Sequence, residues 1–327
     1  MGPEGPDYLF RIYPSSMNSA QIEEIQECAP VAIFGFNRPR HLERCLESLE
    51  VNREANRTDI FIFVDGPRNE NDVRLVNETR EIARRAYKFR TVTVVEQEFN
   101  LGLGASITSG ISYVLKLHHS LIVLEDDLTV SRYFLSYMNQ GLDIYKDNSN
   151  VGSIHGFNFN FEEPLSEPYF IRGGDCLGWA TWADRWSLFS KDSAGTYTKL
   201  KKLNLIKAFD LDGSFRYSDI LKNEIRDGFH SWAINWHASL FSYGKFTLYP
   251  GLSLIEYNGA DGSGTHPIKN STLWDTKLSE KFAWDFPNNV VESKDGLQQL
   301  KKYYEKTYSS RNPLLGLTNW IRYKFLS

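Results

Sequence analysis

Cysteine is scarce in this sequence, with only Cys28, Cys45 and Cys176 present. Their spacing matches neither a disulfide framework nor the paired pattern of a structural zinc site, so both are excluded and a reducing compartment is indicated. Cys45 falls on the apolar stripe of a predicted helix. We therefore interpret it as a small core residue.

A basic leader and long apolar runs are also lacking. Residues 1–6 hold no basic stretch followed by an apolar one, so they are not read as a secretory signal. No run approaches the roughly 20 apolar residues that a membrane span needs. The net charge of -4 gives no electrostatic footprint for nucleic acid. These absences predict a cytoplasmic protein without a nucleic acid partner.

What the sequence does contain is an alternation of short apolar runs and amphipathic stretches. Strands are predicted over residues 30–37, 59–65, 91–96 and 121–124, and helices over residues 38–50, 71–87 and 106–117. Ser131 is expected to cap a further helix, and a strand follows at residues 151–157. This rhythm predicts an α/β fold, Rossmann-like, with a mixed but mainly parallel sheet flanked by helices.

The second half of the chain is rich in aromatic residues and is expected to be largely helical. Trp179, Trp182 and Trp186 are spaced as one face of a helix, and Trp179 beside Gly178 is a candidate floor for a pocket. Helices are expected at residues 215–226 and 231–243, then a strand at 246–254. The glycine-rich residues 258–266 are predicted to form a mobile loop that brings His266 over a ligand, or else a plain linker.

Polar side chains gather where the predicted strands end. Glu125, Asp126 and Asp127 directly follow a buried strand. Further polar residues close the two preceding strands, namely Asn37, Arg38 and Asp65. Ligands of open α/β sheets bind at the carboxyl ends of strands, and adjacent carboxylates there need a cation, basic groups or hydroxyls. The alternative is a solvated turn that caps the next helix.

The segment 100–104 lies between a strand and a helix, so its backbone amides are candidates to approach a phosphate or a ribose. Asn100 and Gly102 are the residues singled out. A tight turn is the plainer alternative. The dinucleotide fingerprint G-x-G-x-x-G is not completed, because Ile107 stands at its third glycine. This argues against a nicotinamide dehydrogenase.

Taken together, residues 30–266 resemble nucleotide-sugar glycosyltransferases of the GT-A fold, most closely the N-acetylglucosaminyltransferase I type and its bacterial relatives. The stretches that carry the resemblance are residues 35–38, 64–66, 123–128 and 177–179, followed by the loop to His266. The resemblance implies a lead-in at 1–29, a nucleotide-sugar-binding half at 30–160, an acceptor half at 161–270 and a C-terminal extension at 271–327.

The resemblance also implies roles for the polar residues. Asp127 would bind the divalent metal that bridges the donor diphosphate, Mn²⁺ or Mg²⁺, and Glu125 and Asp126 would contact the donor sugar and ribose. The base pocket would be lined by Asn37, Arg38 and Asp65. UDP is the donor nucleotide that the resemblance suggests, and a glycan is the acceptor.

The general base is the point at which the sequence departs from this family. Inverting members carry an aspartate just before the tryptophan-containing helix of the second half, whereas here His230 or Ser231 aligns there. His230 could act as base because an imidazole is partly neutral at physiological pH. Asp227, three residues upstream, is the alternative.

Two other functions were weighed. A nucleotide-sugar pyrophosphorylase would carry a glycine-rich basic loop after the first strand, but residues 37–40 contain no glycine. A non-catalytic carbohydrate-binding or scaffold domain would account for the aromatic residues but not for three consecutive acids.

The C-terminal residues 319–326 interleave aromatic and aliphatic residues with Arg322 and Lys324. This pattern suits a weak peripheral contact with the inner face of a membrane, where a lipid-linked acceptor would lie. It also suits a last helix that docks on the domain or on a second copy in a homodimer, and docking is the favoured interpretation.

Overall fold

The computed structural model describes residues 11–14, 28–228, 231–261 and 276–309. Within these ranges the main sheet has nine strands in the order β1-β4-β3-β2-β5-β9-β7-β10-β8. They are β1 Arg11–Pro14, β2 Val31–Gly35, β3 Asp59–Val64, β4 Thr91–Glu96, β5 Ser120–Glu125, β7 Val151–His155, β8 Tyr169–Arg172, β9 Trp179–Trp182 and β10 Phe246–Tyr249. A second sheet pairs β6 Leu128–Val130 with β11 Ile255–Tyr257.

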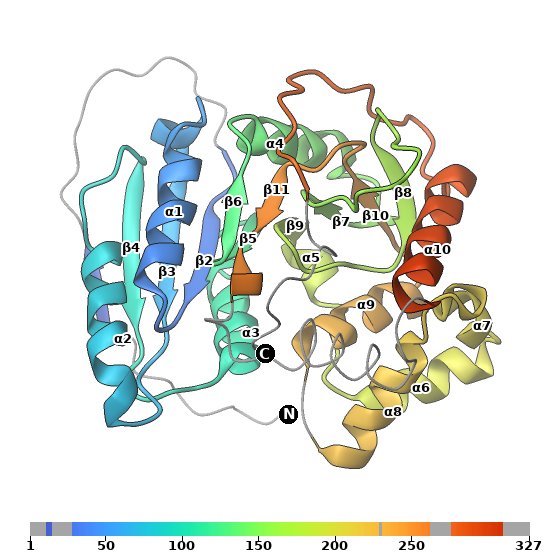
Figure 1. Cartoon of the computed structure of the whole chain (residues 1–327), viewed down its shortest axis with the longest axis horizontal. Helices are drawn as coiled ribbons and strands as arrows, with labels where there is room; N and C mark the ends of the chain where they lie inside the picture. The colour runs from blue at the N-terminus through green and yellow to red at the C-terminus, as the bar shows by residue number, and fades with distance from the viewer. Residues whose placement is uncertain (1–10, 15–27, 229–230, 262–275, 310–327) are drawn as a thin grey trace.

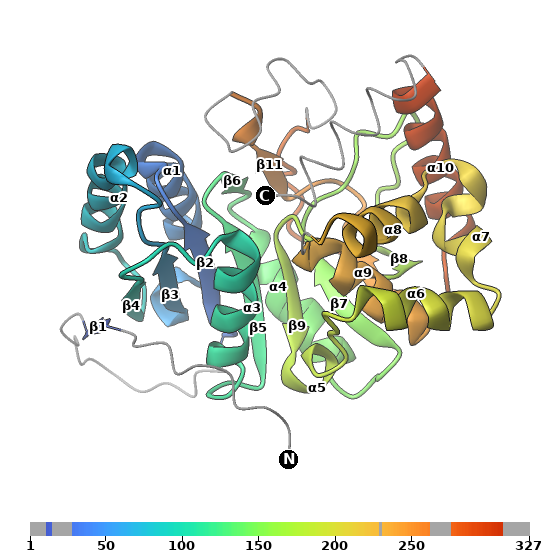
Figure 2. The ribbon, with the colours of Figure 1, turned by 90° about the horizontal axis from the view of Figure 1, so that it is seen from below.

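Helices cover the sheets and form a separate group at one end. They are α1 Pro39–Glu50, α2 Glu70–Ala83, α3 Leu103–Val114, α4 Phe134–Tyr145, α5 Ala183–Trp186, α6 Ser193–Lys202, α7 Ile206–Phe209, α8 Tyr217–Asp227, α9 Trp232–Ser242 and α10 Lys294–Ser309. Short 3₁₀ turns lie at η1 Ala55–Arg57, η2 Leu211–Gly213 and η3 Gly259–Asp261. Figures 1 and 2 show α6 to α10 gathered at the end of the molecule opposite α1 and α2.

The βα units of the first half form as the sequence predicts. Strands β4, β3, β2 and β5 run parallel, because each is joined to the next along the chain by a helix. Helix α1 begins at Pro39, which needs no hydrogen-bond partner for its nitrogen in the first turn, and it buries Leu42, Cys45, Leu46 and Leu49. The parallel order brings the carboxyl ends of β2, β3 and β5 to one edge, which confirms the α/β architecture.

Strand β9 corrects the prediction of a helix across Trp179, Trp182 and Trp186. Residues Trp179–Trp182 are extended and pair antiparallel with β5 on one side and β7 on the other, and only α5 is helical. Gly178, with φ of 63°, turns the chain into the strand. The three tryptophans fit a helical spacing, but the ladder hydrogen bonds of β9 to β5 on one side and β7 on the other decide the conformation.

Several predicted element ends also shift. Helix α2 ends at Ala83 rather than near Tyr87. Ser131 is not the N-cap of α4, which is Tyr133. The Ser131 Oγ accepts from the Tyr133 amide at 3.3 Å, and the same hydroxyl donates to the Ser279 carbonyl. The strand expected over residues 246–254 breaks after Tyr249, and the chain re-enters as β11, which pairs with β6.

The C-terminal part of the described chain packs against the domain. Leu300 and Tyr304 of α10 are buried, and the Tyr304 hydroxyl lies 2.9 Å from that of Tyr217. Residues 319–326, for which membrane contact or docking was predicted, lie outside the described residues. None of the described helices combines the length and the apolar character required to cross a membrane. In the same ranges all three cysteines are buried, and none of them forms a disulfide.

Candidate active site

The three predicted acids lie together at the carboxyl end of β5. Asp126 and Asp127 are 2% and 7% exposed, while Glu125 is partly exposed. Register with β2 fixes their position, since Phe34 pairs with Glu125 and the Asp126 amide donates to the Phe34 carbonyl at 2.9 Å. The chain therefore carries three carboxylates into one edge of a sheet that is otherwise apolar.

Arg38, which follows β2, is the basic partner of this cluster. Its Nη1 lies 3.0 Å from Asp127 Oδ2, its Nε lies 3.4 Å from Asp126 Oδ2, and its Nη2 donates to Asp126 Oδ1. In the part of the chain that the structure describes, no other basic side chain forms an ion pair with these acids. One guanidinium thus faces three carboxyl groups.

This imbalance perturbs the protonation of the cluster. Burial, reinforced by the charge of Asp127, raises the pKa of Glu125 to about 8. Burial also raises the pKa of Asp126, although Arg38 opposes the shift. For Arg38 itself burial acts to lower the pKa, but the charges of Asp126 and Asp127 outweigh it and the pKa is raised. The cluster is therefore electrostatically suited to an additional cation.

A segment far along the chain, residues 257–261 at the end of β11 and after it, lies over the acids. Because β11 pairs with β6, the Asn258 amide reaches the Asp127 carbonyl at 2.8 Å. A Cβ atom at Gly259 would lie 2.6 Å from Asp127 Oδ2 and 2.4 Å from the Tyr257 hydroxyl, so only glycine fits there. Asp261 Oδ2 lies 3.2 Å from His41 Nε2. The predicted loop thus begins on top of the acids, and its end at His266 lies outside the described residues.

Asp65, at the end of β3, is brought together with Asn100 and Gly102. Its Oδ1 accepts from the amides of Gly66 at 2.9 Å and Leu101 at 2.8 Å. Its Oδ2 accepts from the Gly102 amide at 3.0 Å and Asn100 Nδ2 at 3.2 Å. Burial raises the pKa of this carboxyl, and these bonds oppose the shift. The amides that were expected to approach a phosphate are directed at Asp65 instead, so the carboxylate shapes the loop.

Asn37 and Arg38 are adjacent but face different partners. Asn37 Nδ2 donates to Asp72 Oδ1 at 2.9 Å, and Arg68 holds the same carboxylate through Nε at 2.8 Å and Nη2 at 3.0 Å. The Arg68 guanidinium lies 4.9 Å from the centre of the Phe36 ring. This network joins the end of β2 to the start of α2, beside the loop that Asp65 holds.

The two candidate bases fall in the connection from α8 to α9. Asp227 is the last residue of α8, its carboxyl is 47% exposed, and it accepts from Arg226 Nε at 2.6 Å. His230 lies outside the described residues, and Ser231, which follows it, is buried as the N-cap of α9. Neither the exposed position of Asp227 nor its pairing with Arg226 marks it as a poised base.

Trp179 does not present a face to a ligand in this structure. It is fully buried, with ring centres 6.0 Å from Trp186, 5.9 Å from Trp232 and 5.3 Å from Trp236. The expectation that it floors a pocket is therefore replaced by a place in the aromatic core between β9 and α9. The reason is that β9 is an interior strand, with neighbours on both sides.

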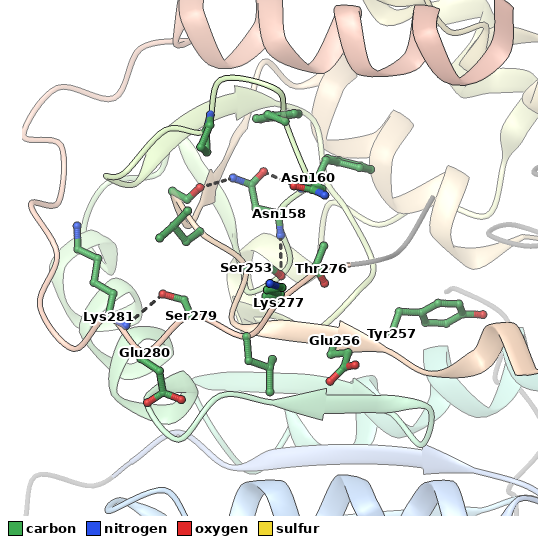
Figure 3. Close-up of a pocket in the computed structure, with 16 residues that line it drawn as sticks. Asn158, Asn160, Ser253, Glu256, Tyr257, Thr276, Lys277, Ser279, Glu280 and Lys281 are labelled. Atoms are coloured by element: carbon green, nitrogen blue, oxygen red, sulfur yellow. Dashed lines mark hydrogen bonds between the residues drawn. The ribbon is translucent and has the colours of Figure 1, made fainter. Parts of the chain in front are cut away.

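A cavity of about 820 Å³ opens at the same edge of the sheet (Figure 3). Its walls come from the segments after β7, after β10, in β11 and at residues 276–281. Glu256 and Tyr257 of β11 belong to it. Sequence reasoning missed these residues because it placed them beyond one strand over residues 246–254, whereas β10 ends at Tyr249 and a separate strand, β11, forms by pairing with β6.

The acidic cluster can hold a divalent cation only if a bound ligand supplies the remaining coordinating atoms. No group of three or more His, Cys, Asp or Glu side chains could hold a metal within the described ranges. Asp127 offers a hard carboxylate oxygen, and the excess negative charge beside it favours a cation. A nearly complete protein cage is excluded there, but a site made of Asp127 and substrate oxygens is compatible with the geometry.

Comparison with known proteins adds a family match over part of the chain. Residues 31–185 match the family model "Glycosyl transferase family 2". These residues include Arg38, Asp65 and the three acids, together with the strands that position them.

Individual relatives are distant. "Amylovoran biosynthesis glycosyltransferase AmsE" of Erwinia amylovora is 27% identical over 113 residues, which are 33% of this chain and 38% of that protein. The chain thus matches little more than a third of that relative's length.

Two solved structures are also similar. One is "Mannosyltransferase PcManGT from Pyrobaculum calidifontis in complex with GDP-Man and Mn2+", with a TM-score of 0.28, 14% identity and coverage of 39% of this chain and 35% of that one. The other is S. aureus TarS 1-349, with a TM-score of 0.36, 10% identity and coverage of 69% and 59%.

Proposed function

We propose that this chain, a family 2 glycosyltransferase of the GT-A fold by its match over residues 31–185, moves a sugar from a nucleoside diphosphate onto a glycan acceptor. One observation carries the proposal. Three carboxyl groups lie together at the carboxyl edge of the sheet, and the one guanidinium among them binds only Asp126 and Asp127, an arrangement that favours a further cation and, with it, a phosphorylated ligand.

In this proposal the three acids have different roles. Asp127 would hold Mn²⁺ or Mg²⁺ together with donor diphosphate oxygens. The bound ion would supply Lewis-acid stabilisation of the negative charge on the departing nucleoside diphosphate. Glu125 and Asp126 would accept hydrogen bonds from the donor sugar and ribose, and Arg38 would orient both aspartates.

The nucleotide would lie along the edge formed by β2 and β3. Asn37, Asp65, Asn100 and Gly102 stand there, and the hydrogen bonds of Asp65 hold the loop in one shape before any ligand arrives. Such preorganisation lowers the entropy lost on binding. We propose UDP as the first nucleotide to test, on the resemblance described above.

Transfer with inversion requires a base beside the acceptor hydroxyl. We propose His230 for this role, ahead of Asp227, whose carboxylate is exposed and already paired with Arg226. Loss of transfer in His230→Ala, with Asp227→Asn nearly unchanged, would support the assignment. The reverse pattern would transfer the role to Asp227.

A bacterial surface polysaccharide is the proposed end product. The name of AmsE refers to amylovoran biosynthesis, and this is the type of pathway we propose for the present chain. A lipid-linked acceptor, with peripheral membrane contact through residues 319–326, belongs to the same proposal.

The decisive experiment is a thermal-shift screen of nucleoside diphosphates with and without Mn²⁺, followed by product analysis with the matching nucleotide sugars. A ligand at 100 times its Kd stabilises by about 2.7 kcal/mol, well within detection. Metal-dependent stabilisation followed by sugar transfer is expected. If no nucleoside diphosphate raises the melting temperature with Mn²⁺, the proposed function is wrong.

A further inference from the structure

The cavity shown in Figure 3 lies beside the acids because of the sheet topology. Strands β5 and β7 both pair antiparallel with β9, so they point the same way and their carboxyl ends share an edge. The wall residues from Asn158 onward follow β7 at that edge. The cavity volume of about 820 Å³ falls in the range of small-molecule sites, roughly 300–1,000 Å³.

The two-stranded sheet connects the cavity wall directly to the acids. Tyr257, a wall residue, pairs with Leu128, the residue that follows Asp127. A Cβ atom placed on Gly259 would lie 2.4 Å from the Tyr257 hydroxyl and 2.6 Å from Asp127 Oδ2, so these two oxygens border the same space. Tyr257 therefore joins the cavity wall to the residue that is proposed to hold the metal.

The charges on the walls disfavour an anionic ligand. Two lysines and two glutamates contribute, Lys277, Lys281, Glu256 and Glu280. Lys281 is engaged by Glu167 and by the Ser166 carbonyl. Among the described wall residues this leaves one lysine that is not paired with Glu167, Lys277, and two carboxylates. A phosphate or carboxylate ligand would therefore lack enough positive charge to bind there.

The remaining walls mix apolar surface with hydrogen-bonding groups. Phe159, Phe161 and Leu252 supply apolar surface, while Asn160 is exposed into solvent beside them. Asn158 is held in the wall because its Nδ2 donates to the Pro250 and Gly251 carbonyls. Its backbone amide also donates to Ser253 Oγ, and Figure 3 shows this bond. A sugar ring, with hydroxyl edges and C–H faces, matches such a surface better than a purely apolar or a charged ligand.

Glu256 is the wall residue whose side chain is available to bind a ligand. It is partly buried in β11, opposite Thr129, and its carboxylate makes no hydrogen bond or ion pair with the described part of the chain. A carboxylate in a cavity wall without a protein donor can accept a hydrogen bond from a ligand, and a sugar hydroxyl supplies such a donor.

We infer that this cavity is the acceptor subsite, that it takes an uncharged glycosyl unit, and that Glu256 accepts a hydrogen bond from a hydroxyl of that unit. The inference rests on the proposed function, because it makes the cavity the second substrate site of a transferase. It assigns Glu256 to recognition of the acceptor, and it leaves proton abstraction to the α8–α9 connection.

Saturation-transfer NMR tests the cavity without requiring turnover. The probes are the methyl glycosides of glucose, galactose, mannose and N-acetylglucosamine, with methyl glucuronide and glycerol phosphate as anionic comparisons. Wild-type protein should transfer saturation to at least one neutral glycoside and to neither anion. Glu256→Gln should weaken that binding about tenfold, the loss of one charge-assisted bond.

Two further variants complete the design. Asn160→Trp, at an exposed wall position, should fill the cavity and abolish the signal, whereas Glu47→Gln on exposed α1 should leave it unchanged. Signals that persist in Asn160→Trp, that come only from the anions, or that never arise in the wild type overturn the inference.

The thermal shift with UDP and Mn²⁺, measured on the same samples, separates the two proposals. If that shift persists while no glycoside binds in the cavity, only the acceptor inference falls. If glycosides bind as expected but no nucleotide and metal stabilise the protein, the proposed function falls and the cavity remains a saccharide site.

Discussion

Arg38 Nη1 lies 3.0 Å from Asp127 Oδ2, so the residue proposed to hold the metal is already bound to an internal cation. The same guanidinium reaches Asp126. Arg38 follows β2 and the aspartates follow β5, and these neighbouring parallel strands make the contact possible. A cation that arrives with the donor must therefore share Asp127 with Arg38 or displace it.

Arg38→Ala should destabilise the protein when metal is removed. The three carboxylates lose their counter-charge, and breaking a buried pair costs about 3 kcal/mol. Mn²⁺ should restore part of the loss. Thermal unfolding in EDTA and in Mn²⁺ measures both effects, with the exposed Arg40→Ala as control. Equal melting temperatures for Arg38→Ala and Arg40→Ala in EDTA would show that the pair is not stabilising.

Asp127→Ala should abolish sugar transfer and leave the fold intact. Removing one of three crowded carboxyl groups relieves repulsion, and Arg38 keeps its bonds to Asp126. Turnover and the Mn²⁺ dependence of the nucleotide thermal shift are the readouts. Near-normal turnover at limiting Mn²⁺ would exclude Asp127 as a metal ligand.

Glu125 should make the metal-free protein less stable as the pH rises. Its pKa is about 8 in the folded protein and 4.5 for an ordinary glutamate, so folding binds a proton between these values and stability falls over that window. The penalty is fully present above pH 8 and amounts to at most about 5 kcal/mol.

Glu125→Gln should remove this pH dependence. Denaturant unfolding in EDTA at pH 5 and pH 8.5 should show a larger loss of stability in the wild type than in the variant. Parallel pH profiles for the two proteins would contradict a raised pKa at this position.

Asp65→Asn should loosen the loop at residues 100–102. The carboxylate accepts bonds from the Leu101 and Gly102 amides, and an amide group placed there would turn a donor toward one of them. A loss of about 2 kcal/mol in stability is expected. Hydrogen exchange at Leu101 and Gly102 should accelerate.

The matched control is Asp59→Asn at the other end of β3, where Asp59 pairs with Arg90. It should leave exchange in the loop unchanged, because it lies at the opposite edge of the sheet. Unaltered exchange in Asp65→Asn would show that the loop is held by other contacts.

The sequence by itself determined the βα units and the residues that end their strands. Strand β4 runs over Thr91–Glu96 as predicted, and the acids stand at the carboxyl end of β5, with Glu125 as its last residue, because apolar runs and helical periodicity are local signals. The gathering of Arg38 and the acids at one edge also follows, since parallel strands bring like ends together.

Only the tertiary structure decided which partners these elements meet. Trp179 and Trp182 satisfy a helical spacing, yet they are extended in β9 because β9 pairs with β5 and β7. The stabilisation comes from pairing between distant strands and is absent from the isolated segment. The Gly102 amide turns to Asp65 across 37 residues, and β11 returns to β6 across more than 120 residues to build the wall that carries Glu256. Such contacts depend on register between distant segments, and local pattern does not encode that register.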